Sequence, residues 1–181
     1  SDADDVAYLA ALVDGLVAEG CVDPTRVYVT GLSGGGRMAS WLGCVESARY
    51  AAIAPVVGLR AGNPRPEKPD EPDPASCQPK RSMPVIAFAG DKDTVNPIQG
   101  GGAGYWRYTL HAAEQRWAAL NGCQAAPTTQ WVAPSVYEER YTSCRGDADV
   151  VARVTVGGAH VWLADNDAMW TFVSRYRRGA R

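Results

Sequence analysis

The sequence has few of the features that indicate a nucleic-acid, membrane or metal-binding protein. Lysine occurs only at Lys68, Lys80 and Lys92 and the formal net charge is -2, so we expect no basic surface for nucleic acid or an anionic membrane. Two histidines, His111 and His160, are too few for a site built on several histidines. No apolar run approaches the roughly 18 residues of a membrane span. We therefore expect no metal and no cofactor.

The cysteines also lack the spacing of a metal or redox motif. None of the five forms a C-x-x-C pair with another, which argues against zinc and against a thioredoxin-like site. Disulfides made in an oxidising compartment explain scattered cysteines better, so we expect a secreted or periplasmic protein. Residues 1–5 contain no basic or apolar leader, and a signal peptide would lie outside the sequence. Length and composition, 181 residues with 46% hydrophobic residues, fit one globular domain.

Strand and helix patterns alternate along the chain. This alternation is typical of a mainly parallel α/β sheet with helices on both faces. A proline-rich stretch at about 58–83 interrupts it, and we expect a surface excursion within one domain because strands flank it on both sides. Strands are predicted at residues 27–30, 51–57, 84–89, 138–142 and 150–156, and helices at 4–19, from about 35, at 105–120 and at 168–178.

A glycine-rich turn places Ser33 between a strand and a helix. Residues 31–35 match G-x-S-x-G, and the strand before them ends at Thr30, which is the context of a nucleophile elbow. Such a turn holds its serine in an unfavourable conformation, so we expect Gly31 and Gly35 to be required because a Cβ there would clash. A phosphate-binding loop is the alternative, but no lysine follows at that motif's spacing. Ser33 is the predicted nucleophile.

A serine hydroxyl needs a base to remove its proton, and His160 is better placed for this than His111. His160 follows the predicted strand 150–156 through a glycine-rich loop, at the strand end where ligands meet open α/β sheets. His111 instead lies within a predicted helix.

The acid that orients the imidazole is expected to follow another strand. Asp91 and Asp93 both come directly after the strand 84–89, and position alone leaves both open. The chain order serine, aspartate, histidine is that of the α/β-hydrolases and differs from that of the trypsin-like and subtilisin-like enzymes.

Six segments together resemble the secreted esterases of the polyhydroxybutyrate depolymerase and feruloyl esterase family. The resemblance covers most of the chain and implies an α/β-hydrolase fold. In that family a G-x-x-D motif, which falls on residues 90–93, carries the acid, so the resemblance selects Asp93 over Asp91. The segments are residues 4–6, 23–36 (Asp-Pro-Thr-Arg-Val-Tyr-Val-Thr-Gly-Leu-Ser-Gly-Gly-Gly), 51–56, 121–123, 141–144 and 157–162 (Gly-Gly-Ala-His-Val-Trp).

The resemblance also implies roles for residues outside the triad. Gly34, directly after the nucleophile, would donate one oxyanion N–H, and Trp162 would contact the substrate. Family members pair the cysteines that correspond to Cys123 and Cys144. We further expect Cys44 and Cys77 to form a disulfide that ties the proline-rich excursion to the helix after Ser33.

The strands that precede the nucleophile strand in this fold have no counterpart here. The second oxyanion donor normally comes from a loop after one of those strands. We therefore expect residues 1–181 to be the C-terminal portion of a single catalytic domain. A companion N-terminal segment or chain would complete the sheet, supply that donor and pair with Cys21, the odd cysteine.

The expected function is that of a serine carboxylesterase that works through an acyl-enzyme. Its substrates would be feruloyl or acetyl esters of plant polysaccharide, or hydroxyalkanoate polyesters, as the resemblance implies. Two alternatives stay open. The missing strands favour a non-catalytic remnant or binding module, and the same fold also carries serine peptidases.

Overall fold

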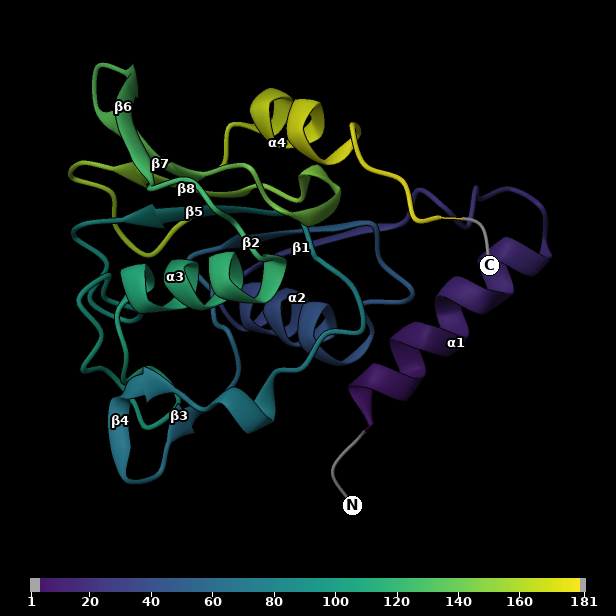
Figure 1. Ribbon diagram of the computed structural model, residues 1–181, viewed down its shortest axis with the longest axis horizontal. Coiled ribbons are helices and arrows are strands. Elements are labelled where there is room, and N and C mark those ends of the chain that lie inside the picture. The colour runs from purple at the N-terminus through teal and green to yellow at the C-terminus, as the bar shows by residue number, and fades with distance from the viewer. Residues whose placement is uncertain (1–3, 180–181) are drawn as a thin grey trace.

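One six-stranded sheet forms the centre of the molecule (Figure 1). The computed structural model describes residues 4–179. The four strands from β1 to β8 in this order pair in parallel, and the last two pairings are antiparallel, which confirms the predicted mainly parallel sheet. The strand order is β1 (Tyr28–Leu32), β2 (Ala52–Val56), β5 (Val85–Gly90), β8 (Val150–Thr155), β7 (Val136–Tyr141) and β6 (Thr128–Ala133).

Helices cover both faces of this sheet, as predicted. Figure 1 shows α2 (Gly34–Val45) and α3 (Leu110–Asn121) on one side and α4 (Asn166–Val173) on the other. Successive side chains of β5 point to opposite faces of the sheet and pack in two separate hydrophobic clusters. Val85 packs in the cluster that contains Trp117 of α3, and Ile86 packs in the cluster that contains Phe172 of α4. α1 (Asp5–Ala18) packs only partly buried side chains against the first cluster. None of the described helices is long and apolar enough to cross a membrane.

Several predicted boundaries were wrong for local reasons. α3 begins at Leu110 and not at 105, because the Thr109 side chain caps its first turn by accepting from the Ala112 N–H. α4 begins after its cap Asp165 and ends at Val173, so residues 174–178 are not helical. β6 was not predicted at all, because its six residues are all exposed and the strand has no buried face to give an alternating pattern.

The proline-rich excursion is a small surface structure with buried ends. It contains the antiparallel strands β3 (Pro64–Arg65) and β4 (Lys68–Pro72) and the 3-10 helix η1 (Pro74–Ser76). Leu59 before this hairpin and Met83 after it are both buried in the core. The predicted domain of residues 1–181 includes residues 1–3 and 180–181, which lie outside the described residues.

Both expected disulfides are present. Cys44 of α2 is bonded to Cys77 at the end of the excursion, and Cys123 after α3 is bonded to Cys144 after β7. Cys21 is exposed and free in the described structure.

Removing either disulfide should destabilise the protein substantially. The bonds close loops with sequence separations of 33 and 21 residues. The loss of that constraint on the unfolded chain corresponds to about 3–4 kcal/mol for each bond. Urea unfolding of the Cys44→Ala/Cys77→Ala and Cys123→Ala/Cys144→Ala proteins measures the effect, with Cys21→Ser as the control. Midpoints equal to that of the control would contradict a structural role for these bonds.

A buried carboxylate joins β7 to β8. Glu138 is 1% exposed and accepts hydrogen bonds from Arg140 Nε (3.0 Å) and Arg153 Nε (2.9 Å). Arg153 is also its direct cross-strand partner. Burial alone would raise the pKa of Glu138, but the hydrogen bonds from Arg153 and then Arg140 outweigh it and lower the pKa below its ordinary value.

Glu138→Gln should therefore lower stability at neutral pH and have a smaller effect in acid. A lowered folded-state pKa contributes stability above the unfolded pKa near 4.5, and that contribution is lost as pH falls through the folded value. We expect a loss of about 1–3 kcal/mol at pH 7, because two charged donors lose their carboxylate. Thermal unfolding of both proteins at pH 7 and pH 3 tests this, and a difference that grows toward low pH would refute it.

Candidate active site

The turn between β1 and α2 holds Ser33 in a strained conformation. β1 ends at Leu32, two residues beyond the predicted strand, and α2 begins at Gly34. Ser33 is therefore the single residue between the strand and the helix. Ser33 has φ 54° and ψ -110°, outside the regions that a serine prefers. Its N–H donates to the carbonyl of Val56 on the neighbouring strand at 2.9 Å. This bond and the two flanking elements fix the hydroxyl at the carboxyl end of the sheet.

The expectation that both motif glycines must lack a Cβ was right for Gly31 and wrong for Gly35. A Cβ on Gly31 would lie 2.5 Å from the carbonyl carbon of Gly35, which forbids any side chain there. A Cβ on Gly35 would meet nothing within 4 Å. Gly36, and not Gly35, is the second position that must lack a Cβ, because a Cβ there would lie 2.7 Å from the Val56 oxygen. Gly36 thus allows α2 to approach β2 closely.

Ser33, His160 and Asp93 form one hydrogen-bonded chain. Ser33 Oγ lies 2.7 Å from His160 Nε2, and His160 Nδ1 lies 2.8 Å from Asp93 Oδ2. The three residues follow β1, β8 and β5, whose carboxyl ends meet at one edge of the parallel sheet. An imidazole held in this way can accept the serine proton on one nitrogen while the carboxylate keeps the proton on the other.

The two aspartates have different hydrogen-bond partners. Asp93 is 4% exposed, and its other oxygen accepts from the backbone N–H groups of Val95 and Asn96, both at 2.8 Å. These donors stabilise the ionised carboxylate and fix its orientation toward the imidazole. Asp91 instead accepts from the Gly157 N–H at 2.6 Å and so ties the loop after β5 to the loop after β8.

Close approach of these two loops depends on Gly90. A Cβ there would lie 2.2 Å from the carbonyl oxygen of Gly158, two residues before His160. The backbone N–H of Lys92 donates to the same oxygen at 2.9 Å. Only a glycine at the end of β5 allows the loops that carry Asp93 and His160 to touch.

His111 belongs to a different cluster. Its Nδ1 lies 2.8 Å from Glu139 Oε1, and Glu114 completes a group whose potential ligand atoms lie within 4.8 Å of one another. An imidazole and two carboxylates could hold a divalent cation such as zinc. Burial, and then the charge of Glu139, raise the pKa of Glu114 well above its ordinary value. The prediction of no metal site considered cysteine spacing and the number of histidines, and did not address this mixed group.

The other two predicted site residues, Gly34 and Trp162, line different pockets. Gly34 lines a pocket of about 270 Å³ together with Arg37, Trp41, Arg60 and others, and these arginines were not anticipated as site residues. Trp162 is 43% exposed and donates through Nε1 to Asn166 Oδ1 at 3.0 Å. It lines a separate, mainly apolar pocket of about 410 Å³ between the β1 edge and α4.

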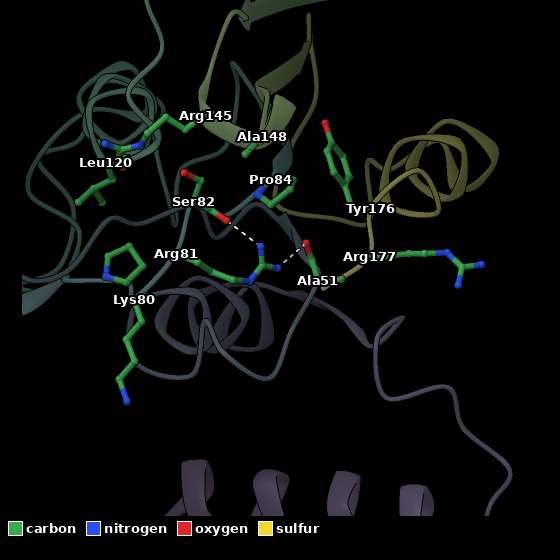
Figure 2. Close-up of a pocket in the computed structure, with 12 residues that line it drawn as sticks. Ala51, Lys80, Arg81, Ser82, Pro84, Leu120, Arg145, Ala148, Tyr176 and Arg177 are labelled. Carbon is green, nitrogen blue, oxygen red and sulfur yellow. Dashed lines mark hydrogen bonds between the residues drawn. The ribbon is translucent and has the colours of Figure 1, made fainter. Parts of the chain in front are cut away.

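A basic pocket of about 420 Å³ lies at the opposite end of the sheet (Figure 2). Ala51 and Pro84, which precede β2 and β5, place it at the amino ends of the parallel strands. Figure 2 shows the Arg81 guanidinium against backbone carbonyls, and it donates to those of Ala51 and Ser82 among others. Arg145 likewise donates to the Leu120 carbonyl. These cations hold the chain together, and the pocket is separate from Ser33.

Comparisons with known proteins find similarity to esterases. No protein-family model matches the chain. The chain is 30% identical over 182 residues to feruloyl esterase B of Piromyces equi, an alignment that covers 97% of this chain and 32% of that protein. It therefore spans about a third of the length of this curated relative.

Two solved structures share the fold. Acetyl xylan esterase from Aspergillus awamori matches with a TM-score of 0.63 at 15% identity, over 93% of this chain and 66% of that one. A thermostable esterase matches with a TM-score of 0.54 at 16% identity, over 97% of this chain and 38% of that one. The sequence is similar to that of one named esterase and the fold to those of two others, as the motifs indicated: the chain has an α/β-hydrolase fold and is similar to esterases.

Proposed function

We propose that the protein is a serine carboxylesterase with Ser33 as nucleophile, His160 as general base and acid, and Asp93 as the group that orients the imidazole. The observation that carries the proposal is the unbroken chain of hydrogen bonds from Ser33 Oγ through His160 to Asp93. Each bond lies within 2.8 Å, inside the range required for proton transfer.

The reaction proceeds in two halves. Ser33 Oγ attacks the ester carbonyl carbon as its proton moves to His160 Nε2, and the tetrahedral intermediate collapses when His160 returns that proton to the leaving alkoxide. An alcohol departs and the acyl group stays on Ser33. Water then attacks the acyl-enzyme with His160 again as base, and the acid is released. The imidazolium formed in each half is stabilised by Asp93, whose charge the Val95 and Asn96 N–H groups support.

The negative oxygen of each intermediate needs hydrogen-bond donors. The N–H of Gly34, at the first position of α2, is one of them, and the positive end of the helix dipole adds to it. We propose that a companion segment or chain outside residues 1–181 supplies the second donor and pairs with β1. β1 pairs only with β2 among the described residues, and Leu32 on it is 41% exposed. Cys21 is free to join that segment by a disulfide.

For the substrate we propose feruloyl or acetyl esters of plant polysaccharides, with hydroxyalkanoate polyesters as the alternative. The names of feruloyl esterase B and of acetyl xylan esterase support the first class. The aromatic side chain of Trp162, partly exposed and two residues after His160, offers a surface for an aromatic acyl group or a sugar ring. The two disulfides fit a protein that matures in an oxidising compartment, and we propose that it is secreted or periplasmic.

Hydrolysis assays on the full-length protein test this proposal. A short-chain p-nitrophenyl ester, methyl ferulate, a hydroxybutyrate oligomer and a peptide anilide are compared, with the Ser33→Ala protein as the blank. Ester hydrolysis well above the blank supports the proposal. Cleavage of the anilide alone would indicate a peptidase, and no turnover of any substrate would indicate a binding module.

A further inference from the structure

Two arginines beside the candidate active site form no salt bridge within the described part of the chain. Arg60 is 6% exposed, and its guanidinium carbon lies 3.5 Å from the ring centre of Trp106 and 4.1 Å from that of Tyr108. Its Nε and Nη1 donate to the carbonyls of Leu59 and Tyr108, but the buried Nη2 has no hydrogen-bond partner among residues 4–179. The guanidinium carbon of Arg37 lies 3.8 Å from the ring centre of Tyr105, and its buried Nε is likewise without a hydrogen-bond partner among these residues.

The two charges are close enough to affect each other. Burial lowers the pKa of Arg60 to about 10, and the nearby charge of Arg37 contributes in the same direction. Arg60 is still a cation at neutral pH. No carboxylate within residues 4–179 forms a salt bridge with either guanidinium. A buried charge without a partner is costly, and an anion placed between these groups would relieve that cost.

Both arginines line the same pocket next to the nucleophile. The pocket has a volume of about 270 Å³ and includes Gly34, the residue after Ser33. A Cβ on Gly34 would lie 3.6 Å from Arg37 Nη2, so this cation is within a few ångströms of the proposed oxyanion donor. The pocket also lies at the amino end of α2, where the helix dipole adds positive potential.

We propose that this pocket binds a carboxylate group of the substrate, so that the preferred ester carries a negative charge a few bonds from its scissile carbonyl. A guanidinium presents paired donors that match the two oxygens of a carboxylate. Met38 and Trp41, which also line the pocket, suit the carbon skeleton of a small organic acid or a sugar acid better than a bare inorganic ion. The inference rests on the proposed esterase function and narrows its substrate class.

The test compares charged and neutral esters of matched shape. The carboxylate is placed on the acyl side in p-nitrophenyl hydrogen glutarate, whose neutral counterpart is p-nitrophenyl methyl glutarate. It is placed on the alcohol side in 4-acetoxybenzoate, whose counterpart is 4-acetoxybenzamide. We measure kcat/KM on the full-length protein at pH 7 and subtract spontaneous hydrolysis. For at least one pair we expect the charged ester to be preferred about tenfold or more, and that pair identifies the side on which the carboxylate lies.

Variants test whether the preference for the charged ester depends on the arginines of the pocket. Arg37→Gln should lower kcat/KM for the charged ester at least tenfold more than for its neutral counterpart, and Arg37→Lys should retain part of the preference because it keeps the charge. Arg177→Gln removes one positive charge at the opposite end of the sheet and should leave the preference unchanged. Arg37 is used because it lies at the pocket and is less buried than Arg60, whose replacement risks the fold.

Each outcome decides the inference. Equal rates on both members of both pairs, or a preference that Arg37→Gln leaves intact, would overturn the carboxylate site while leaving the esterase function standing. No hydrolysis of any of the four esters would overturn the proposed function and this inference with it.

Discussion

Replacing Ser33 or His160 with alanine is expected to lower kcat for ester hydrolysis by at least about 10³. Without the hydroxyl no acyl-enzyme can form, and without the imidazole the hydroxyl keeps its proton. The two residues act as a unit, so Ser33→Ala/His160→Ala should be little worse than either single variant. Initial rates with a p-nitrophenyl ester measure the effect, and far-ultraviolet circular dichroism checks that each variant is folded.

His111→Ala is the matched control, since it removes the other histidine of the chain. His111 contacts Glu139 and not Ser33, so this variant should retain most of the activity. A loss at His111 comparable with the loss at His160 would show that the base has been assigned to the wrong histidine.

Asp93→Asn is the second large effect, with an expected fall in kcat of roughly 10³–10⁴. The amide cannot carry the negative charge that stabilises the imidazolium. An amide nitrogen that faces His160 Nδ1 also favours the tautomer with its proton on Nε2, which cannot accept the proton of Ser33. The Val95 and Asn96 N–H groups should still hold the side chain in place, so KM and stability should change much less than kcat.

Asp91→Asn provides the comparison for this variant. Asp91 joins two loops through the Gly157 N–H, whereas the His160 imidazole is hydrogen-bonded to Asp93. We expect its replacement to lower the free energy of unfolding and to have a smaller effect on kcat. A larger loss of kcat in Asp91→Asn than in Asp93→Asn would transfer the role of the acid to Asp91.

The site residues that could be predicted from the sequence are those whose position depends on a single strand and the loop that follows it. A buried strand ending before a G-x-S-x-G turn was enough to locate Ser33, and a glycine-rich loop after another strand located His160. Asp91 and Asp93 follow the same strand, and only the resemblance to a family separated them. In the structure the His160 imidazole and the backbone N–H groups of Val95 and Asn96 contact the Asp93 carboxylate, and Asp91 accepts from Gly157 instead.

Features that arise from contacts between distant segments were not predictable. Arg60 and Arg37 lie on different segments, and their common pocket depends on where the loop that carries Tyr105 folds back. Gly36 is constrained most closely by the Val56 oxygen of β2, a contact that the motif does not show, so the motif suggested Gly35 instead. β6 is exposed along its whole length and pairs with β7, and a strand without a buried face leaves no periodic signal in the sequence.

Labelling of the nucleophile tests the central claim most directly. A fluorophosphonate probe reacts with a serine hydroxyl that a neighbouring base activates, and loses fluoride as the Oγ–P bond forms. After reaction with the full-length protein and tryptic digestion, the account predicts one adduct, on Ser33 in the peptide of residues 27–37, and its loss in the His160→Ala protein. No adduct, an adduct on another serine, or labelling that is unaffected by His160→Ala would contradict it.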